Sequence, residues 1–387
     1  MTLLQSPPWI PALLFAIWIL GAWLAMRRLD ELPELPEAVG SASLPRVTLC
    51  IPARNEAAAV GEALDGWLAQ DDPGLRIVVV DDGSTDATAA CLAPRAAAHP
   101  GRLKVLRNDS LPPGWLGKNH ALHLASGEEE ALAAEWLLFT DADVLAAPGL
   151  LRRAFAFREQ HAFDLLSLIP AVDTVGFAER VFIPMATLGF LWAVPFRQVP
   201  RPGHRAHCGV GAFTLVRRAA YDAVQGHAGA PMEVIDDMSL AGRIKAAGYV
   251  NRVAQGGPDL HLRMYRGLAD LVVGMRKNAL ALPWLFPLAP LALAVTLGLG
   301  LSPLLLALTG WPWAGFWLWL LVPPVMAQAH QRLTQKPADL AWAFWPLNAL
   351  LLASGLLWAF ADRVRGVNHW RGREVKVHGG NHHQPQP

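Results

Sequence analysis

Three long stretches of this chain contain no charged residue at all. Residues 1–26, 278–331 and 340–361 lack Asp, Glu, Lys and Arg. A helix that crosses a membrane needs about 20 mostly apolar residues, and uncharged runs of this length are rare in soluble domains. We therefore expect an N-terminal transmembrane anchor in residues 1–28 and about three C-terminal transmembrane segments in residues 279–361. The alternative is a set of buried core helices.

The charges beside these runs suggest an orientation. Arg27 and Arg28 follow the first run, and positive charge near a membrane usually marks the cytoplasmic side. The run has no basic start and no small-residue cleavage site, which favours an uncleaved anchor over a signal peptide. The middle of the chain is then cytoplasmic, and the protein is multi-pass. Four full crossings would place the basic, flexible tail expected at residues 362–387 outside. Either one C-terminal segment fails to cross, or the tail breaks the rule.

Composition excludes several classes of protein. The formal net charge is only +1, so no basic surface recruits nucleic acid, and we expect no nucleic-acid partner. With 53% of its residues apolar, the chain is not disordered. Cys50, Cys91 and Cys208 form no C-x-x-C pair, which predicts neither a disulfide framework nor a zinc site.

Residues 45–278 are expected to form one globular α/β domain. Apolar strand-like runs alternate with helical segments, which is typical of a mostly parallel sheet covered on both faces. Ligands on such sheets bind at the carboxyl ends of the strands. The predicted strands are 47–53, 75–81, 103–107, 136–141 and 164–171, and the predicted helices include 56–69, 85–98 and 238–247.

The first two strands end in polar motifs. The first ends in P-A-R-N-E, which starts at Pro52, and lacks the G-x-G-x-x-G of nicotinamide enzymes. The second ends in D-D-G-S-T-D, which starts at Asp81. A turn with a helix cap explains that motif in structural terms. Alternatively, Asp81 and Asp82 accept hydrogen bonds from a nucleobase and a ribose, because buried carboxylates need partners.

The fourth strand ends in T-D-A-D, with carboxylates at Asp141 and Asp143. On an extended chain alternate residues share a face, so both side chains would point the same way. Two carboxylates so close favour a cation between them, and hard oxygen ligands favour Mg²⁺ or Mn²⁺ held together with substrate phosphates. We therefore expect a Mg²⁺ or Mn²⁺ site here.

A third acidic pair, Asp236 and Asp237, opens a predicted helix. Acidic residues are favoured at a helix N-terminus by the helix dipole, which is one explanation. The other is catalysis, because transfer of a sugar from a nucleotide sugar needs one carboxylate to remove the proton of the acceptor hydroxyl.

Together these motifs resemble the family 2 glycosyltransferases, which have the GT-A fold. The match covers roughly residues 45–280 and runs in family order through P-A-R-N-E, V-D-D-G-S-T-D, T-D-A-D-V, C-G-V-G-A-F and D-D-M-S-L-A-G-R-I-K-A-A-G. The resemblance implies a metal-dependent, hexosyltransferase-like enzyme that works by one in-line, inverting displacement. It assigns the following roles: Asp237 as catalytic base supported by Asp236; Pro52, Ala53, Arg54, Glu56, Asp81, Asp82, Lys118, Asp141, Arg263 and Arg266 in nucleotide-sugar binding; Asp143 and Asp141 as metal ligands; and Gly209, Gly211 and Ala212 at the acceptor.

One of these assignments rests on residues that depart from the family pattern, and two others have an alternative structural interpretation. The family usually has Glu-Asp where this chain has Asp236 and Asp237. Lys118 is either a basic residue beside the diphosphate or a surface lysine that opens a helix. The segment that starts at Cys208 either lets the acceptor approach the backbone or is a glycine-rich strand with a bulge.

The stretch from Arg263 to Gly267 bears on whether such an enzyme would add one sugar or many. Processive family members carry Q-x-x-R-W here, whereas this chain reads R-M-Y-R-G. Gly267 replaces the Trp that would stack on a growing glycan, which favours transfer of one sugar to a lipid. The whole layout resembles the bacterial hopene-associated glycosyltransferases, which implies a UDP-sugar donor, a hopanoid-related lipid acceptor and the bacterial inner membrane. The alternatives are a processive polysaccharide synthase and a non-catalytic membrane scaffold.

Two further features have competing interpretations. The uncharged run 181–196 is short for a span and is either an interfacial segment that guides a lipid or a buried core helix. The paired histidines, such as His204 and His207, lack Cys or Glu at ligand spacing, so we expect no metal site there.

Overall fold

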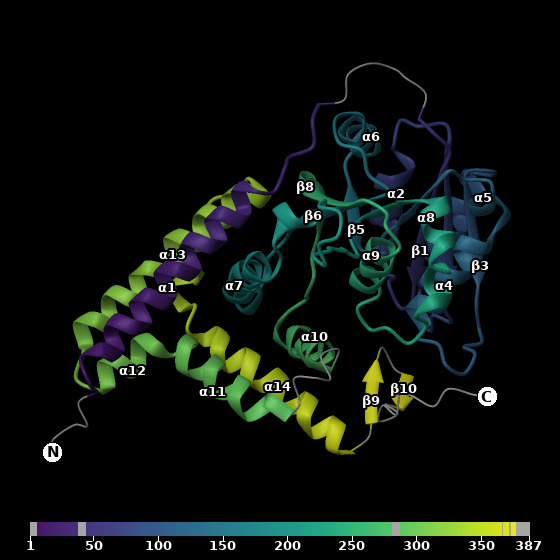
Figure 1. The fold of residues 1–387 in the computed structure, drawn as a ribbon. Coiled ribbons are helices and arrows are strands. Elements are labelled where there is room, and N and C mark those ends of the chain that lie inside the picture. Colours follow the sequence, from purple (N-terminus) through teal and green to yellow (C-terminus); the bar gives the residue numbers. More distant parts are fainter. Residues whose placement is uncertain (1–5, 38–43, 281–286, 366, 371–372, 377–387) are drawn as a thin grey trace, which may run out of the picture.

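The structure is a computed structural model that describes residues 6–37, 44–280, 287–365, 367–370 and 373–376. Its centre is one large mixed sheet (Figure 1). The strands of this sheet are β1 Val47–Ala53, β2 Leu75–Asp81, β3 Leu103–Arg107, β4 Trp136–Phe139, β5 Val144–Ala146, β6 Leu165–Val172, β7 Thr214–Arg217 and β8 Asn251–Leu262. Their order is β3-β2-β1-β4-β7-β6-β8-β5. The pairs β3–β2, β2–β1, β1–β4 and β6–β8 are parallel. The predicted mostly parallel α/β fold is therefore confirmed.

Helices cover both faces of the sheet because alternate strand residues point to opposite sides. Leu49 and Ile51 of β1 pack in one apolar cluster with α2 and α6, whereas Cys50, between them, packs with α4, α8 and α9. The helices of the domain are α2 Val60–Leu68, α3 Thr88–Ala98, α4 Gly117–Gly127, α5 Glu129–Leu132, α6 Leu150–Gln160, α8 Arg218–Ala223 and α9 Asp236–Ala246, with the 3₁₀ turns η1 Phe196–Gln198 and η2 Gly226–Gly229.

One strand end differs from its prediction, and the difference matters for the site. The predicted strand 136–141 stops at Phe139 as β4. The N–H of Val144 donates to the carbonyl of Asp141 (3.4 Å), so residues 141–144 form a turn that leads into β5. The argument that Asp141 and Asp143 share a face of an extended strand was therefore wrong.

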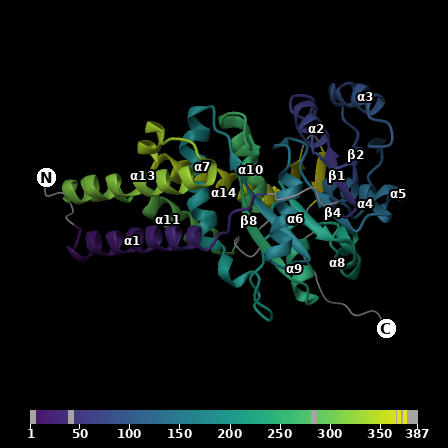
Figure 2. The same cartoon turned by 90° about the horizontal axis from the view of Figure 1, so that it is seen from above.

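Two long apolar helices lie side by side away from the sheet (Figures 1 and 2). They are α1 Trp9–Asp30 and α13 Pro312–Thr334, and they run in the same direction. The N–H of Ser6 donates to the carbonyl of Thr309 (3.1 Å) near their first residues, and Arg332 pairs with Asp30 near their last.

By length and composition, two described helices could each cross a membrane. These are α1 and α14 Leu347–Arg365. A third candidate exists if α11 Ala289–Gly300 and α12 Ser302–Leu308, which are bent by 72°, count as one span. Because α13 lies along α1, it reaches as far as α1 does.

The helix α14 follows a different path from α1 and α13. The turn η4 Leu340–Phe344 brings Trp345 against Trp18 in the middle of α1, with ring centroids 4.8 Å apart. From there α14 packs on α10 Leu268–Leu280 and α11. Near its end, buried Asp362 pairs with buried Arg276 of α10. The last residues of α14 therefore lie beside α10, which directly follows the strand-rich domain.

The uncharged run 181–196 lies mostly in α7 Phe177–Ala193. This helix packs against α1, α13 and α14, and buries Leu188 and Leu191 in a cluster shared with Trp18 and Val322. In the predicted flexible tail, α14 continues to Arg365, and β9 Val367–Trp370 pairs with β10 Arg373–Lys376. The end of the tail, including His382 and His383, lies outside the described residues.

Candidate active site

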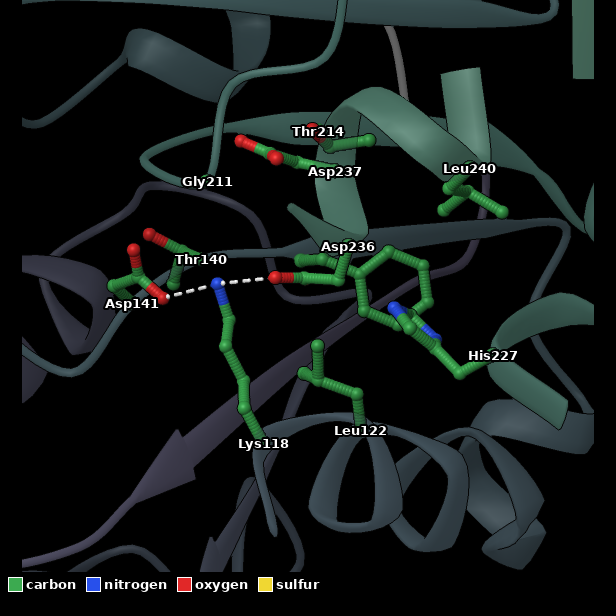
Figure 3. A pocket seen from close by; sticks show the side chains of 11 residues that line it. Lys118, Leu122, Thr140, Asp141, Gly211, Thr214, His227, Asp236, Asp237 and Leu240 are labelled. Carbon is green, nitrogen blue, oxygen red and sulfur yellow. Dashed lines mark ion pairs between the residues drawn. The ribbon is translucent and has the colours of Figure 1, made fainter. Parts of the chain in front are cut away.

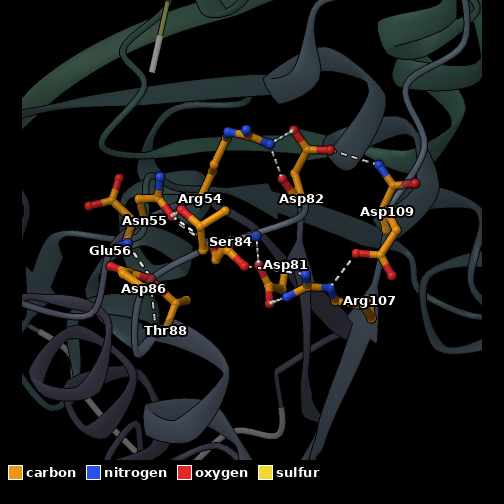
Figure 4. Close-up of polar contacts among 12 residues, drawn as sticks. Arg54, Asn55, Glu56, Asp81, Asp82, Ser84, Asp86, Thr88, Arg107 and Asp109 are labelled. Atoms are coloured by element: carbon orange, nitrogen blue, oxygen red, sulfur yellow. Dashed lines mark hydrogen bonds and ion pairs between the residues drawn. The ribbon is translucent and has the colours of Figure 1, made fainter. Parts of the chain in front are cut away.

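The loops that follow β1 and β2 are fastened together at the carboxyl edge of the sheet (Figure 4). The N–H of Asp82 donates to the carbonyl of Ala53 (2.8 Å), and the N–H of Glu56 donates to Oγ1 of Thr88 (2.8 Å). Six of the residues predicted to bind the nucleotide sugar therefore share one rim: Pro52, Ala53, Arg54, Glu56, Asp81 and Asp82.

Asp81 has its polar contacts within the protein. It is 1% exposed, accepts a hydrogen bond from the N–H of Ser84 (2.9 Å) and pairs with Arg107 (2.6 Å). These contacts hold the turn after β2, as the structural interpretation of the motif expects. Asp81 is therefore placed to support the rim rather than to face a ligand.

Asp82 is also buried, but its partners belong to the loops around it. Nδ2 of Asn108 donates to Oδ1 of Asp82 (2.7 Å), and Nη1 of Arg54 lies 3.7 Å from Oδ2. Asn108 also lies 3.3 Å from Nδ1 of His120, a buried residue of α4. The carboxylate of Asp82 is thus held in one orientation at the rim.

A pocket of about 260 Å³ lies between α4, the end of β4 and the start of α9 (Figure 3). Two of the three acidic clusters meet in it, although about 95 residues separate them in the sequence. The lining consists of Lys118, Leu122, Phe139, Thr140, Asp141, Gly211, Thr214, His227, Asp236, Asp237 and Leu240. Neither Asp82 nor Asp143 belongs to this lining.

Lys118 joins the two acidic clusters across the pocket. Its Nζ lies 2.9 Å from Oδ1 of Asp141 and 3.1 Å from Oδ1 of Asp236 (Figure 3). Burial opposes the charged ammonium, but Asp141, Asp236 and Asp237 together raise the pKa of Lys118 well above its usual value. Lys118 is therefore a fixed positive charge inside the pocket, not a free surface lysine.

Asp237 lies in the same pocket as Lys118, and its pKa is raised. Burial and the neighbouring carboxylate of Asp236 raise the pKa of Asp237, while Lys118 works in the opposite direction. Its Oδ1 accepts a hydrogen bond from the N–H of Met238 (2.8 Å), which orients the carboxylate at the start of α9. A raised pKa makes a carboxylate a stronger base, which suits proton removal from a hydroxyl.

Of the segment C-G-V-G-A-F, Gly211 lines the pocket, and the segment is not part of a strand, since β7 begins only at Thr214. A β-carbon on Gly209 would overlap the backbone carbonyl of Asp237. A β-carbon on Gly211 would lie 2.8 Å from Oδ2 of Asp141. The Ala212 carbonyl accepts from Oγ1 of Thr140 (2.7 Å), which fixes this segment against the end of β4.

Asp141 and Asp143 have the donor chemistry of a divalent-cation site. Both residues follow β4 and have carboxylate oxygens, and the ammonium of Lys118 beside Asp141 shows that positive charge is accommodated there. No group of three or more His, Cys, Asp or Glu side chains in the described part of the chain is arranged to hold a metal ion. Substrate phosphates would complete the ligand set of such a site.

Arg263 does not line the pocket, because its guanidinium is bound to the buried carboxylate of Glu179. Its Nη2 and Nε donate to Glu179 of α7 at 2.8 and 3.1 Å. Glu179 is 1% exposed and also accepts from the N–H groups of Val175 (3.0 Å) and Gly267 (2.8 Å). Burial would raise the pKa of Glu179, but Arg263 and the two N–H groups lower it to about 2. Arg266 is exposed.

The structure also reveals residues that the motifs did not indicate. Nδ2 of buried Asn119 donates to the carbonyls of Pro231 (3.1 Å) and Glu233 (2.9 Å), and thereby ties α4 to the loop before Asp236. His227 lines the pocket, and burial with help from Lys118 lowers its pKa to about 3. Neither residue follows a predicted strand, so no pattern singled them out.

Comparison with known proteins agrees with this geometry. Residues 48–224 match the family model of glycosyl transferase family 2. This match spans fewer than half of the 387 residues, so it is a similarity of part of the chain. A stretch of 238 residues is 29% identical to the 4,4'-diaponeurosporenoate glycosyltransferase of Staphylococcus aureus strain USA300 and covers 60% of each chain. In strain MRSA252 the identity is 29% over 241 residues. The chain thus spans only 60% of the length of these curated relatives.

A solved structure shares the fold of this chain. The mannosyltransferase PcManGT from Pyrobaculum calidifontis, in complex with GDP-Man and Mn²⁺, superposes with a TM-score of 0.55 at 20% identity. The match covers 91% of this chain and 97% of that one. The GT-A expectation is therefore confirmed.

Proposed function

We propose that the chain is a membrane-bound, inverting, hexosyltransferase-like enzyme that moves one sugar from a nucleotide-sugar donor to a lipid acceptor. The observation that carries the proposal is the pocket in which Lys118 pairs with both Asp141 and Asp236, beside Asp237. A UDP-sugar is the proposed donor, and a hopanoid-related lipid in a bacterial inner membrane is the proposed acceptor.

The chemistry follows from the positions of the charges. Asp237 removes the proton of the acceptor hydroxyl as the hydroxyl oxygen bonds to the anomeric carbon. At the same time the bond from that carbon to the diphosphate oxygen breaks. The displacement is single and in line, so the anomeric configuration inverts. Lys118, whose Nζ lies 3.1 Å from Oδ1 of Asp236, stabilises the negative charge that develops on the diphosphate.

Asp141 and Asp143 would hold Mg²⁺ or Mn²⁺, which neutralises the charge of the leaving diphosphate when bound. Asp82, held by Asn108, is the proposed contact to the nucleoside, together with the neighbouring rim. Gly209, Gly211 and Ala212 border the acceptor, because their wall has no side chain larger than a methyl group at those positions.

Three features support a lipid acceptor that receives one sugar. The apolar helices α1, α7 and α13 pack directly onto the domain. The curated relative is named as a 4,4'-diaponeurosporenoate glycosyltransferase. Gly267 stands where processive enzymes have Trp, and its N–H is bound by Glu179.

We further propose a topology in which the domain and the basic tail lie on the same, cytoplasmic side. Helices α1 and α13 cross in the same direction, and α11 with α12 returns the chain between them. The chain passes Trp345, level with the middle of α1, just before α14 begins at Leu347, and Asp362 near the end of α14 lies beside α10. It therefore enters and leaves on the cytoplasmic side, which removes the conflict with the basic tail.

The decisive experiment incubates membranes containing the full chain with labelled nucleotide sugars and asks which lipid fraction gains label. Label in a lipid carrying one sugar, lost in Asp237→Asn, is the expected result. Polymer formation would instead establish a processive synthase. Absence of any transfer or donor hydrolysis with every nucleotide sugar would leave only a scaffold.

A further inference from the structure

The last turn of α1 has the features of a membrane–water interface. The guanidinium of Arg27 lies over the ring of Trp23 at 5.2 Å, and Trp23 is 54% exposed. Trp and Arg are enriched where a helix leaves the hydrocarbon core. Glu31 follows, and its carboxylate pairs with Arg28 at 2.9 Å.

A loop rich in arginine is attached at this level of α1. This basic loop, residues 197–205, follows α7 and leads to the glycine wall of the pocket. The N–H of Arg197 donates to Oε2 of Glu31 (3.2 Å). Phe196 and Val199 are buried in the same apolar cluster as Leu29. The basic loop therefore lies one turn beyond Arg27, at the proposed membrane surface.

The backbone of the basic loop is held in place from the domain side. Nζ of Lys245, on α9, donates to the carbonyls of Val199 (2.7 Å) and Arg201 (2.6 Å). These contacts fix the backbone of the loop at Val199 and Arg201. The loop is therefore preformed, and ordering it on binding costs little.

The arginines of the basic loop have no acidic partners within the protein. Arg197, Arg201 and Arg205 are exposed, and no side-chain ion pair or hydrogen bond of theirs occurs among the residues that the structure describes. The nearest acids on α1 are already engaged, Glu31 with Arg28 and Asp30 with Arg332. The basic loop therefore carries an excess of positive charge.

We propose that the basic loop binds the headgroups of anionic phospholipids in the membrane that the protein spans. The proposal rests on the membrane orientation given above. Positive side chains next to a bilayer attract anionic lipids, roughly fivefold in affinity per Arg. Because the basic loop continues into Cys208 and Gly209, binding of headgroups holds the acceptor side of the pocket against the bilayer surface.

The test compares two lipids that differ only in headgroup. Full-length protein in non-ionic detergent is titrated with phosphatidylglycerol or phosphatidylcholine that carry the same acyl-chain fluorophore, and binding is followed by fluorescence anisotropy. Any contact of the chains with α1 or α13 is common to both lipids, so the affinity ratio isolates the headgroup. We expect wild type to prefer phosphatidylglycerol, and the double variant R201Q/R205Q to lower that ratio roughly 25-fold.

A matched control removes two exposed arginines far from the basic loop in sequence, as R46Q/R158Q, and should keep the wild-type ratio. A wild-type ratio near one, or an unchanged ratio in R201Q/R205Q, overturns the proposal. Equal competition by free glycerol phosphate would show an anion site and not a lipid surface, and would also overturn it. The measurement needs no sugar transfer, so failure of the lipid-binding proposal can be distinguished from failure of the proposed activity.

Discussion

The α-carbon of Gly211 faces the carboxylate of Asp141 so closely that a β-carbon there would lie 2.8 Å from Oδ2. The same β-carbon would lie 3.4 Å from Nζ of Lys118. We therefore expect Gly211→Ala to displace Asp141 or Lys118 and to lower kcat/KM about 100-fold or more. The measurement is transfer kinetics together with a thermal melt. Gly127→Ala is the control, because a β-carbon at Gly127 meets nothing within 4 Å. Equal kinetics in both variants would contradict the assignment of this wall.

Asp237→Asn should lose about 10³-fold in kcat while the protein stays at least as stable as wild type. The reason is that burial and Asp236 disfavour the charge of Asp237, so removal of that charge relieves a cost of folding. Transfer assays and melting temperatures measured on the same preparation check both halves. Donor hydrolysis that persists unchanged in Asp237→Asn would refute the role as base.

Lys118→Gln should shift the pH dependence of kcat/KM. Lys118 lowers the pKa of Asp237, so its removal raises that pKa further. A base works only when deprotonated, and activity is lost as the pH falls through its pKa. The acid limb of the profile should therefore move to higher pH in Lys118→Gln. Lys118→Arg, which keeps the charge, should leave the limb near its wild-type position, and an unmoved limb in both would argue against this coupling.

Metal removal should weaken nucleotide binding in wild type but not in Asp143→Ala. The expectation rests on Asp143 as a ligand of Mg²⁺ or Mn²⁺ that a bound diphosphate shares. Calorimetric titration with UDP, with Mn²⁺ or with EDTA, measures the difference directly. An Asp143→Ala protein that still binds UDP more tightly with Mn²⁺ would remove Asp143 from the ligand set.

Glu179→Gln should destabilise the fold. The pKa of Glu179 is about 2 in the folded chain against 4.5 for an ordinary Glu, so the ionised carboxylate contributes about 3 kcal/mol to stability at neutral pH. Because the folded pKa is the lower one, this contribution is complete above pH 4.5 and is lost as the pH falls towards 2. Unfolding free energies measured across that window should converge for the two proteins at low pH. Asp109→Asn, an exposed carboxylate on the domain, is the control.

Local patterns predicted the core of the domain well. The strands β1, β2 and β3 have the predicted bounds, because each is a short run rich in apolar residues and ended by polar residues, and β1 and β2 are buried on both faces. The pairing of Asp141 with Lys118 and Asp236 was not predictable from spacing, since residues from three elements meet there. The turn at Asp141–Val144 was missed because alternation along a strand assumes that the strand continues.

Contacts between distant residues account for the other differences. Arg263 matched a family position at the diphosphate, but Glu179, 84 residues away, holds its guanidinium. Nothing local to Glu179 distinguishes it from an exposed glutamate at the first turn of a helix. Likewise, Asn119 acts through carbonyl groups of another loop, which have no side-chain signature.

The side-by-side packing of α1 and α13 has a practical consequence for production of the α/β domain in water. Trp18 and Leu29 of α1 share an apolar cluster with Val322 and Met326 of α13. Deleting the first thirty residues would therefore remove α1 and expose the apolar residues of α13 that α1 covers. A chain shortened at its N-terminus should therefore aggregate, whereas the intact chain in detergent keeps α1 packed against α13.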